Sequence, residues 1–234
     1  MTTPAPRPRL SVVFDLDGTL VDSEPNYFEA GRRLLAAHGV TDFTWQDHES
    51  YVGISTRETL ALLRERYGIG APLDALLTDL DRRYLALARA STQVYPEMRK
   101  FAERLHGAGV PMAVASGSSR AAIEAILTGT GLDALIPVRV SADEVAHGKP
   151  APDVFLAAAR LLGADPADCV VLEDAAPGAA AAHAAGMRCV AVPYVAVQAD
   201  DPAFGTADLV FRGGQAEFTA RAAYDWLGDL VQTS

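Results

Sequence analysis

Residues 10–21 of the chain read LSVVFDLDGTLV, and this stretch decides the fold. The apolar run at 12–14 is typical of a strand that is buried on both faces, as in the middle of a parallel sheet. Asp15 ends this run, Asp17 follows two residues later, and Gly18-Thr19 opens a turn. Open α/β sheets place their active sites at the carboxyl ends of strands. The stretch therefore predicts a central strand that ends in two functional carboxylates.

Two carboxylates so close together predict a cation site and phosphate chemistry. Like charges in one small space need a cation, and Mg²⁺ binds one or two carboxylates together with phosphate oxygens. Beside such an ion, one carboxylate is able to attack phosphorus while its neighbour acts as general acid and base. A turn beside a phosphoryl group also leaves little room for a Cβ, which accounts for Gly18. The alternative interpretation is an ordinary strand followed by an Asp-Gly turn.

Composition limits the classes of protein that the chain can belong to. Its 234 residues, half of them hydrophobic, are enough for one substantial core and a small second domain. The net charge of −10 argues against nucleic acid or an anionic membrane as a partner. Cys169 and Cys189 have no metal-ligand spacing, and neither a signal peptide nor a membrane span is evident. We therefore expect the two thiols to be buried and the enzyme to be cytoplasmic. The expected assembly is a monomer or weak homodimer.

The segment after Asp22 predicts a separate helical domain. Helices are predicted at 23–38, where Ser23 would be the N-cap, and at 55–67 and 73–90, and no strand is predicted between them. A helical block of this length, placed directly after the first strand of an α/β pattern, indicates an inserted domain. The predicted domains are therefore an α/β core, residues 1–21 and 94–234, and a helical cap, residues 22–93.

From residue 95 onward, helices and strands alternate. Helices are predicted at 97–106, 120–128, 152–162 and 176–185, and strands at 111–115, 136–140, 169–172 and 189–192. This alternation predicts an α/β fold with a Rossmann-like parallel sheet covered by helices on both sides. The tail predicts an edge strand at 208–211 and a final helix at 215–230.

Three further stretches with functional residues follow predicted strands. Ser116-Gly117-Ser118 places a hydroxyl and backbone N–H groups at the start of a helix, which suits an anion, although a Ser there is also an ordinary N-cap. Lys149 lies in the proline-stiffened loop HGKPAPD, where its charge can be held at a fixed place. Glu173-Asp174 ends an apolar strand, and buried paired acids need a partner such as a metal.

Together these stretches resemble the motifs of the haloacid dehalogenase-like (HAD) hydrolase superfamily. Residues 15–22, DLDGTLVD, are similar to the first motif, and the third motif is similar to GKPAPD. The Glu-Asp pair resembles that of subfamily I, variant 3, which contains sugar phosphatases and β-phosphoglucomutase-like proteins. The helical insert resembles the C1 cap of that subfamily.

The resemblance implies roles for particular residues. Asp15 would be the nucleophile and Asp17 the general acid and base. The residues expected to bind the substrate phosphate are Thr19, Ser116, Gly117 and Lys149. The expected Mg²⁺ ligands are Asp15, Asp17 through its backbone carbonyl, Glu173 and Asp174.

The same resemblance favours hydrolysis of a small phosphorylated metabolite. Dehalogenase-type and phosphonatase-type members lack an acid at the position of Asp17, so a phosphatase that forms an aspartyl-phosphate is the preferred prediction. The main alternative is a β-phosphoglucomutase-like phosphosugar mutase. Such mutases have an Arg directly after a cap Gly-x-Ser, whereas Gly53-Ile54-Ser55 is followed by Thr56 and then Arg57. Tyr27 and Leu80 stand where the mutases carry a His and a Lys.

Two further interpretations concern the cap and the need for catalysis. Tyr27, Gly53 and Arg57 are the candidates for substrate specificity, although packing and solvent exposure also account for such residues. A regulatory or phosphate-sensing protein without turnover is the non-enzymatic alternative, and the presence of Asp15, Asp17, Lys149 and Asp174 together argues against it.

Overall fold

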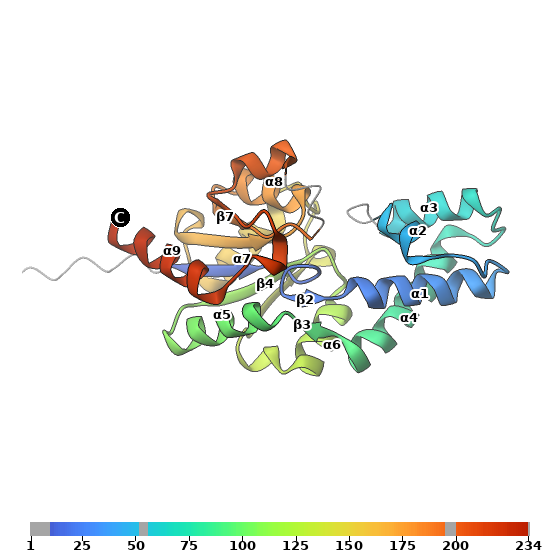
Figure 1. Ribbon diagram of the computed structural model, residues 1–234, viewed down its shortest axis with the longest axis horizontal. Helices are drawn as coiled ribbons and strands as arrows, with labels where there is room; N and C mark the ends of the chain where they lie inside the picture. The colour runs from blue at the N-terminus through green and yellow to red at the C-terminus, as the bar shows by residue number, and fades with distance from the viewer. Residues whose placement is uncertain (1–9, 52–55, 195–199, 234) are drawn as a thin grey trace, which may run out of the picture. The chain divides into compact units, whose positions relative to one another are not determined.

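The computed structural model of the chain describes residues 10–51, 56–194 and 200–233. These residues form two compact units. One consists of the residues before Ser23 and after Thr92, and the other of Ser23–Thr92. The first unit is a sheet enclosed by helices, and the second is made of helices (Figure 1).

The described part of the first unit contains a six-stranded sheet whose neighbouring strands all run parallel, in the order β5-β4-β1-β6-β7-β8. The strands are β1 (Ser11–Phe14), β4 (Met112–Ser116), β5 (Val138–Ser141), β6 (Cys169–Glu173), β7 (Arg188–Ala191) and β8 (Leu209–Val210). The strand β1 lies between β4 and β6, and Val12, Val13 and Phe14 are completely buried. The sequence prediction of a central strand in a parallel α/β sheet is therefore confirmed.

Helices cover both faces of this sheet. They are α5 (Pro96–Gly107), α6 (Arg120–Thr130), α7 (Asp153–Leu162), α8 (Ala176–Ala184) and α9 (Ala220–Thr233). Successive residues of a strand point to opposite faces. Val13 accordingly belongs to the same buried cluster as Phe155 of α7 and Ala179 of α8. On the other face, the ring of Phe14 meets that of Phe101 of α5 edge-on at a centroid distance of 6.0 Å.

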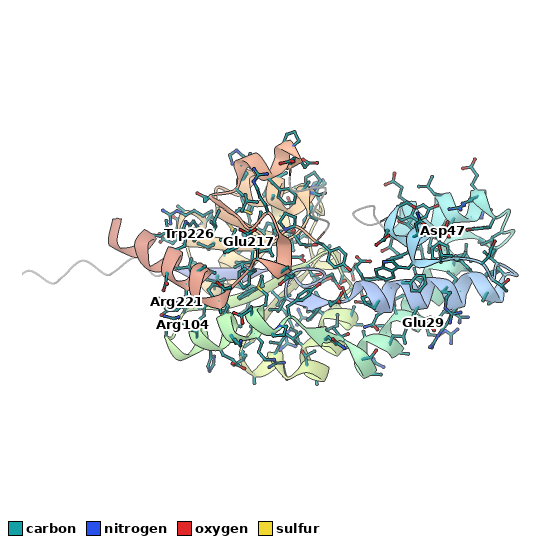
Figure 2. All side chains as sticks on the ribbon, viewed as in Figure 1. Glu29, Asp47, Arg104, Glu217, Arg221 and Trp226 are labelled. Atoms are coloured by element: carbon teal, nitrogen blue, oxygen red, sulfur yellow. The ribbon has the colours of Figure 1, made fainter. Side chains whose placement is uncertain are left out.

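The tail differs in part from the prediction. The predicted edge strand is β8, but the last helix begins at Ala220 instead of Gln215. A short 3₁₀ turn, η6 (Gly214–Ala216), takes the place of the predicted first helical turn. The helix α9 packs on α5, where the Arg104 guanidinium lies 3.8 Å from the centroid of the Tyr224 ring (Figure 2).

The second unit contains α1 (Glu24–Ala37), α2 (Trp45–Glu49), α3 (Thr56–Arg66) and α4 (Leu73–Ser91). The three predicted helices are confirmed as α1, α3 and α4, which pack α1 on α4 and α3 on α4. The short helix α2 was not predicted. A reciprocal capping box between Thr44 and Asp47 begins it. Ser23 is the N-cap residue of α1, as predicted, but its side chain makes no capping hydrogen bond.

A two-stranded pair lies where the chain leaves and re-enters the first unit. The strands β2 (Val21–Asp22) and β3 (Gln93–Val94) are antiparallel, and the sequence analysis did not predict them. Among the helices in the described ranges, none is both long enough and apolar enough to cross a bilayer.

Candidate active site

The turn after β1 brings the first motif against the Glu173-Asp174 pair. The N–H of Gly18 donates to the carbonyl of Val21 at 2.9 Å, and the N–H groups of Leu20 and Val21 donate to the carbonyl of Leu16 at 3.0 Å. Gly18 has φ +82°, and a Cβ there would overlap the carboxylate of Asp174. Glycine is therefore required at this position both by the positive φ and by the Asp174 carboxylate, which comes from a distant part of the chain.

Lys149 is the cation at the centre of the site. Its Nζ lies 2.5 Å from Asp15 Oδ1 and 2.5 Å from Glu173 Oε1. The Lys149 side chain is only 13% exposed, and its Nζ lies 4.8 Å from the centroid of the Phe155 ring. Because the loop between β5 and α7 carries the lysine inward, its charge is held beside the candidate nucleophile.

Three buried carboxylates gather around this lysine. Oxygens of Asp15, Glu173 and Asp174 all lie within 4.8 Å of one another, and we call these residues the acidic cluster. Thr19 Oγ1 donates a hydrogen bond to Asp174 Oδ1 at 2.9 Å. The turn of the first motif and the end of β6 thus form a single site.

The Glu173 carboxylate is held at the start of α8. Its Oε2 accepts hydrogen bonds from the N–H groups of Asp174 and Ala175, both at 2.9 Å. A Cβ at Gly178 would overlap this carboxylate, so the absence of a side chain there makes room for it. Since Oε1 contacts Lys149, Glu173 links the backbone of Asp174 and Ala175 to the lysine.

The electrostatics of the site favour an additional cation. Burial raises the pKa of Asp15 to about 8, with Glu173 and Asp17 adding to this effect and Lys149 opposing it. Burial and the charges of Glu173 and Asp15 raise the pKa of Asp174 well above its ordinary value. Burial by itself would lower the pKa of Lys149, but Asp15 and Glu173 raise it above its usual value. One ammonium thus faces three carboxylates.

This donor set fits a hard divalent ion. Mg²⁺ prefers oxygen ligands and is typically held by one or two carboxylates. Asp15 and Asp174 offer carboxylate oxygens within reach of each other, and their excess negative charge is what a divalent cation would neutralise. The acidic cluster therefore has the composition of a magnesium site.

The Asp17 carboxylate lies apart from the acidic cluster. Its Oδ2 accepts hydrogen bonds from Ser118 Oγ at 2.6 Å and from Ser116 Oγ at 3.2 Å. The N–H of Ser118 in turn donates to Ser116 Oγ at 2.9 Å. The serines at the end of β4 and in the loop after it therefore hold the carboxylate of Asp17, the candidate general acid and base. The predicted Mg²⁺ ligand is a different group of the same residue, its backbone carbonyl.

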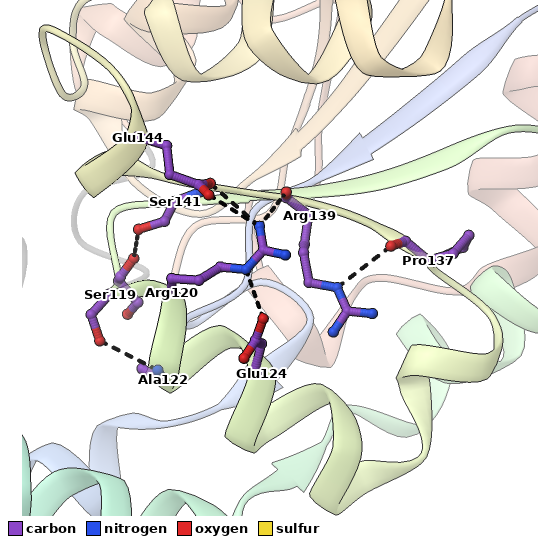
Figure 3. Close-up of polar contacts among 9 residues, drawn as sticks. Ser119, Arg120, Ala122, Glu124, Pro137, Arg139, Ser141 and Glu144 are labelled. Carbon is purple, nitrogen blue, oxygen red and sulfur yellow. Dashed lines mark hydrogen bonds and ion pairs between the residues drawn. The ribbon is translucent and has the colours of Figure 1, made fainter.

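A polar network braces this loop from the neighbouring strand. Ser141 Oγ, at the end of β5, donates to the carbonyl of Ser118 at 2.7 Å, and its N–H donates to Glu144 Oε2 at 2.9 Å. Arg120 Nη1 lies 3.2 Å from Glu144 Oε1 and donates to the carbonyl of Arg139 at 3.1 Å (Figure 3). Arg120 thus serves in this brace.

The other predicted site residues have different surroundings. In the first unit, Thr19 is buried and Gly117 is exposed. In the second unit, the ring of Tyr27 stacks on that of Tyr84 at 3.9 Å, and Arg57 pairs with Asp74 at 2.8 Å. Gly53 lies outside the described residues.

Two residues of the site were not singled out from the sequence. Ser118 belongs to a loop whose hydroxyls were noted, so a second donor there was a possible signal. Gln215 donates from Nε2 to the carbonyl of Thr19 at 2.8 Å. It follows the last predicted strand and lies in no motif, so the sequence offered no signal for it.

Comparison with known proteins identifies the family of the chain. A family model described as haloacid dehalogenase-like hydrolase matches residues 11–186. The chain belongs to this family, in its subfamily I, as the motifs indicate.

Individual relatives cover most of the chain. It is 34% identical over 209 residues to protein CbbY of Rhodobacter capsulatus, covering 85% of this chain and 90% of that protein. It is 36% identical over 191 residues to the fructose-1-phosphate phosphatase YqaB of Escherichia coli (strain K12), covering 77% of this chain and 95% of that protein. A putative β-phosphoglucomutase from Thermotoga maritima has a similar structure, with a TM-score of 0.75 and 26% sequence identity. The match covers 94% of this chain and 99% of that chain.

Proposed function

We propose that this chain is a phosphatase that hydrolyses a small phosphorylated metabolite, a sugar phosphate or similar phosphomonoester, through an aspartyl-phosphate on Asp15. The observation that carries the proposal is the contact of Lys149 with Asp15 inside the buried acidic cluster. A fixed ammonium beside a carboxylate at a strand end suits the transfer of a phosphoryl group, whose charge must be neutralised.

In the first step, an oxygen of Asp15 attacks phosphorus as the bond from phosphorus to the ester oxygen breaks. Asp17, in its protonated form, gives its proton to the leaving oxygen, which departs as an alcohol. Lys149 stabilises the negative charge that Asp15 and the phosphoryl oxygens share. Ser116 and Ser118 orient the Asp17 carboxylate through their hydrogen bonds to Oδ2.

In the second step, the Asp17 carboxylate removes a proton from water. The resulting hydroxide attacks phosphorus, the bond between phosphorus and Asp15 breaks, and inorganic phosphate leaves. Asp17 returns to its protonated form and Asp15 to its carboxylate. One acid thus serves in both half-reactions, which explains why a second carboxylate so close to the nucleophile is needed.

Mg²⁺ is the cofactor that we propose for the acidic cluster. Asp15 and Asp174 would hold it, with the carbonyl of Asp17 and with Glu173 directly or through water. When bound, it supplies positive charge that favours the ionised form of Asp15 and polarises the phosphoryl oxygens. Lys149 remains in place as the second positive charge.

The substrate class follows from the relatives and from the second unit. A relative named as a fructose-1-phosphate phosphatase supports a sugar phosphate. The mutase alternative has a structural neighbour named as a putative β-phosphoglucomutase. In this chain, however, Thr56 stands where the mutases have an Arg, and the positions of the mutase His and Lys are used for packing: Tyr27 stacks on Tyr84, and Leu80 is buried. The nearby Arg57 pairs with Asp74. A phosphatase therefore fits better.

The proposed setting is the cytoplasm, where the buried thiols of Cys169 and Cys189 would stay reduced. The proposed domain roles are a catalytic core for the first unit and a cap that selects the substrate for the second. Tyr27, Gly53 and Arg57 remain the candidate specificity residues of that cap, and a monomer or weak homodimer is the proposed assembly.

The test is a screen of phosphorylated metabolites for release of inorganic phosphate, with Mg²⁺ and with excess EDTA. We expect Mg²⁺-dependent release from at least one sugar phosphate. One arm uses β-glucose 1-phosphate with a bisphosphate primer. Formation of an isomerised sugar phosphate there, without net release of phosphate, would favour the mutase, and absence of both activities would contradict the proposal.

A further inference from the structure

Gln215 reaches the first motif from the tail of the chain. Its Nε2 donates to the carbonyl of Thr19 at 2.8 Å and to the carbonyl of Gly18 at 3.3 Å. Two carbonyl oxygens accept only from a donor, so the amino group of the amide, not its oxygen, faces the turn. Gln215 lies in η6, outside residues 11–186 that the family model matches.

The segment that carries Gln215 is itself firmly placed. Gly214 has φ +61°, and a Cβ there would overlap the carbonyl oxygen of Pro193, which follows β7. The N–H of Gly214 donates to the carbonyl of Phe211 at 2.8 Å, and the N–H of Phe218 donates to the carbonyl of Gly214 at 3.0 Å. These contacts fix the turn on both sides of Gln215.

Aromatic packing anchors the same segment to the core. Phe218 is buried, with its ring centroid 5.1 Å from that of Phe211 and 5.9 Å from that of Phe101 on α5. Glu217, labelled in Figure 2, accepts a hydrogen bond from the N–H of Gly213 at 2.6 Å. Gln215 therefore projects from a rigid support.

The two residues whose carbonyls Gln215 contacts also meet the Asp174 carboxylate of the acidic cluster. Thr19 Oγ1 donates to Asp174 Oδ1 at 2.9 Å, and Gly18 packs so closely on the Asp174 carboxylate that no Cβ fits between them. The carbonyls of these two residues are in turn held by Gln215. The placement of the turn thus determines how Asp15, at its start, faces Asp174.

We propose that Gln215 is a positioning residue that fixes the Gly18-Thr19 turn and thereby the spacing of Asp15 and Asp174. This inference rests on the proposed function for its catalytic consequence, but the binding of Mg²⁺ by the acidic cluster can be measured without substrate. Groups that orient metal ligands from behind typically change metal affinity or activity about 10–100-fold when they are replaced.

The experiment compares Gln215→Met and Gln215→Glu in the full chain. Methionine keeps the length of the side chain and removes both N–H donors, and glutamate keeps the shape while facing two carbonyls with an acceptor. Gln46→Met is the matched control, because Gln46 is exposed on α2 in the other unit. For each variant, the affinity for Mg²⁺ is measured by calorimetry without substrate. The kinetic constants kcat and KM are measured with the best phosphomonoester, and the midpoint of thermal unfolding is measured in EDTA.

We expect both Gln215 variants to lose about tenfold or more in Mg²⁺ affinity. We expect kcat to fall at saturating Mg²⁺ with KM near the wild-type value, and Gln46→Met to match the wild type. Wild-type affinity and kcat in both Gln215 variants would overturn the inference. So would a lowered thermal midpoint with wild-type affinity and kcat, because the role would then be structural. If the wild type binds Mg²⁺ but releases no phosphate, the proposed function fails, and calorimetry alone decides the role of Gln215.

Discussion

Lys149 Nζ lies 2.5 Å from Asp15 Oδ1, although 134 positions separate the two residues along the chain. The same ammonium contacts Glu173, whose carboxylate is fixed by backbone N–H groups at the start of α8. The lysine is therefore oriented from two sides before any substrate arrives. A charge held in advance needs no rearrangement during the reaction, which is the condition for strong electrostatic stabilisation.

Replacing Lys149 tests this charge. We expect Lys149→Met to lower kcat about 10²–10³-fold, since a preorganised charge next to the reacting group is lost. Lys149→Arg should restore little activity, because a planar guanidinium cannot occupy the place of a compact ammonium between two carboxylates. Steady-state kinetics check both variants. Lys100→Met is the control, because Lys100 is the other lysine of the sequence and its side chain is 63% exposed. A Lys149→Met enzyme with wild-type kcat would contradict the role of the lysine.

Asp174→Asn should abolish activity and yet stabilise the protein without metal. The raised pKa of Asp174 means that the folded state disfavours its charged form, so loss of this charge favours folding above the ordinary Asp pKa. Each kcal/mol added to the free energy of unfolding raises the midpoint of thermal unfolding of a chain of this size by about 2–4 °C. Thermal unfolding in EDTA measures the effect, with Asp143→Asn as an exposed control. A thermal midpoint for Asp174→Asn below that of the wild type in EDTA would show that the charge of Asp174 does not destabilise the metal-free fold.

Sequence reasoning was most successful where a buried strand meets a functional group. The apolar runs of β1 and β6 predicted buried strands, and the acids that end them are among the residues that meet in the acidic cluster. Polar groups directly after buried strands are informative because parallel strands bring their carboxyl ends to one edge. Lys149 was recognised from its proline-stiffened loop.

The contacts that sequence reasoning did not find depend on packing between distant elements. The hydrogen bond from Ser118 to Asp17 requires the relative placement of β1 and β4, and that from Gln215 requires the path of the tail beyond β8. Neither follows from local propensity or spacing. The predicted helix at 215–230 was wrong at its start, because the positive φ of Gly214 and the 3₁₀ turn that begins at this residue determine the conformation of the segment, and helical periodicity does not.

Ser118 and Ser119 are neighbours with different contacts, and their alanine variants should differ. Ser118 Oγ donates to Asp17 Oδ2, so we expect Ser118→Ala to lower kcat about tenfold or more, as losses behind a reacting group do. Ser119 Oγ accepts from the N–H of Ala122 and caps α6, so Ser119→Ala should cost about 1 kcal/mol of stability with kcat unchanged. Kinetics and urea unfolding separate the two effects. If Ser118→Ala loses only stability, Asp17 does not need this donor.

The ion pairs of Glu29 on α1 should give a small pH-dependent stabilisation (Figure 2). Hydrogen bonds from Arg32 and Arg33 lower the pKa of Glu29 to about 2 in the folded state. The stabilisation is therefore present above the ordinary Glu pKa and is lost as the pH falls through this range towards the folded-state value. Because the carboxylate is partly exposed, Glu29→Gln should cost only about 0.5 kcal/mol at neutral pH. Urea midpoints at several pH values check this. A difference in urea midpoint between the wild type and Glu29→Gln that becomes larger as the pH falls would contradict this prediction.

The most direct test of the account is the detection of a phosphoryl group on Asp15. In Asp17→Asn, the proton donor of the first step and the base of the second step are both missing, while the nucleophile Asp15 remains. With p-nitrophenyl phosphate, whose leaving group needs no proton, the first step can still occur, so the covalent intermediate should accumulate. The variant is mixed with Mg²⁺ and p-nitrophenyl phosphate and quenched in acid, and its peptides are analysed by mass spectrometry, with Asp15→Asn as the control. We predict one phosphoryl group on the peptide that contains Asp15 and none in the control. An unmodified Asp15 peptide, from a variant that still binds substrate, would contradict the proposed mechanism.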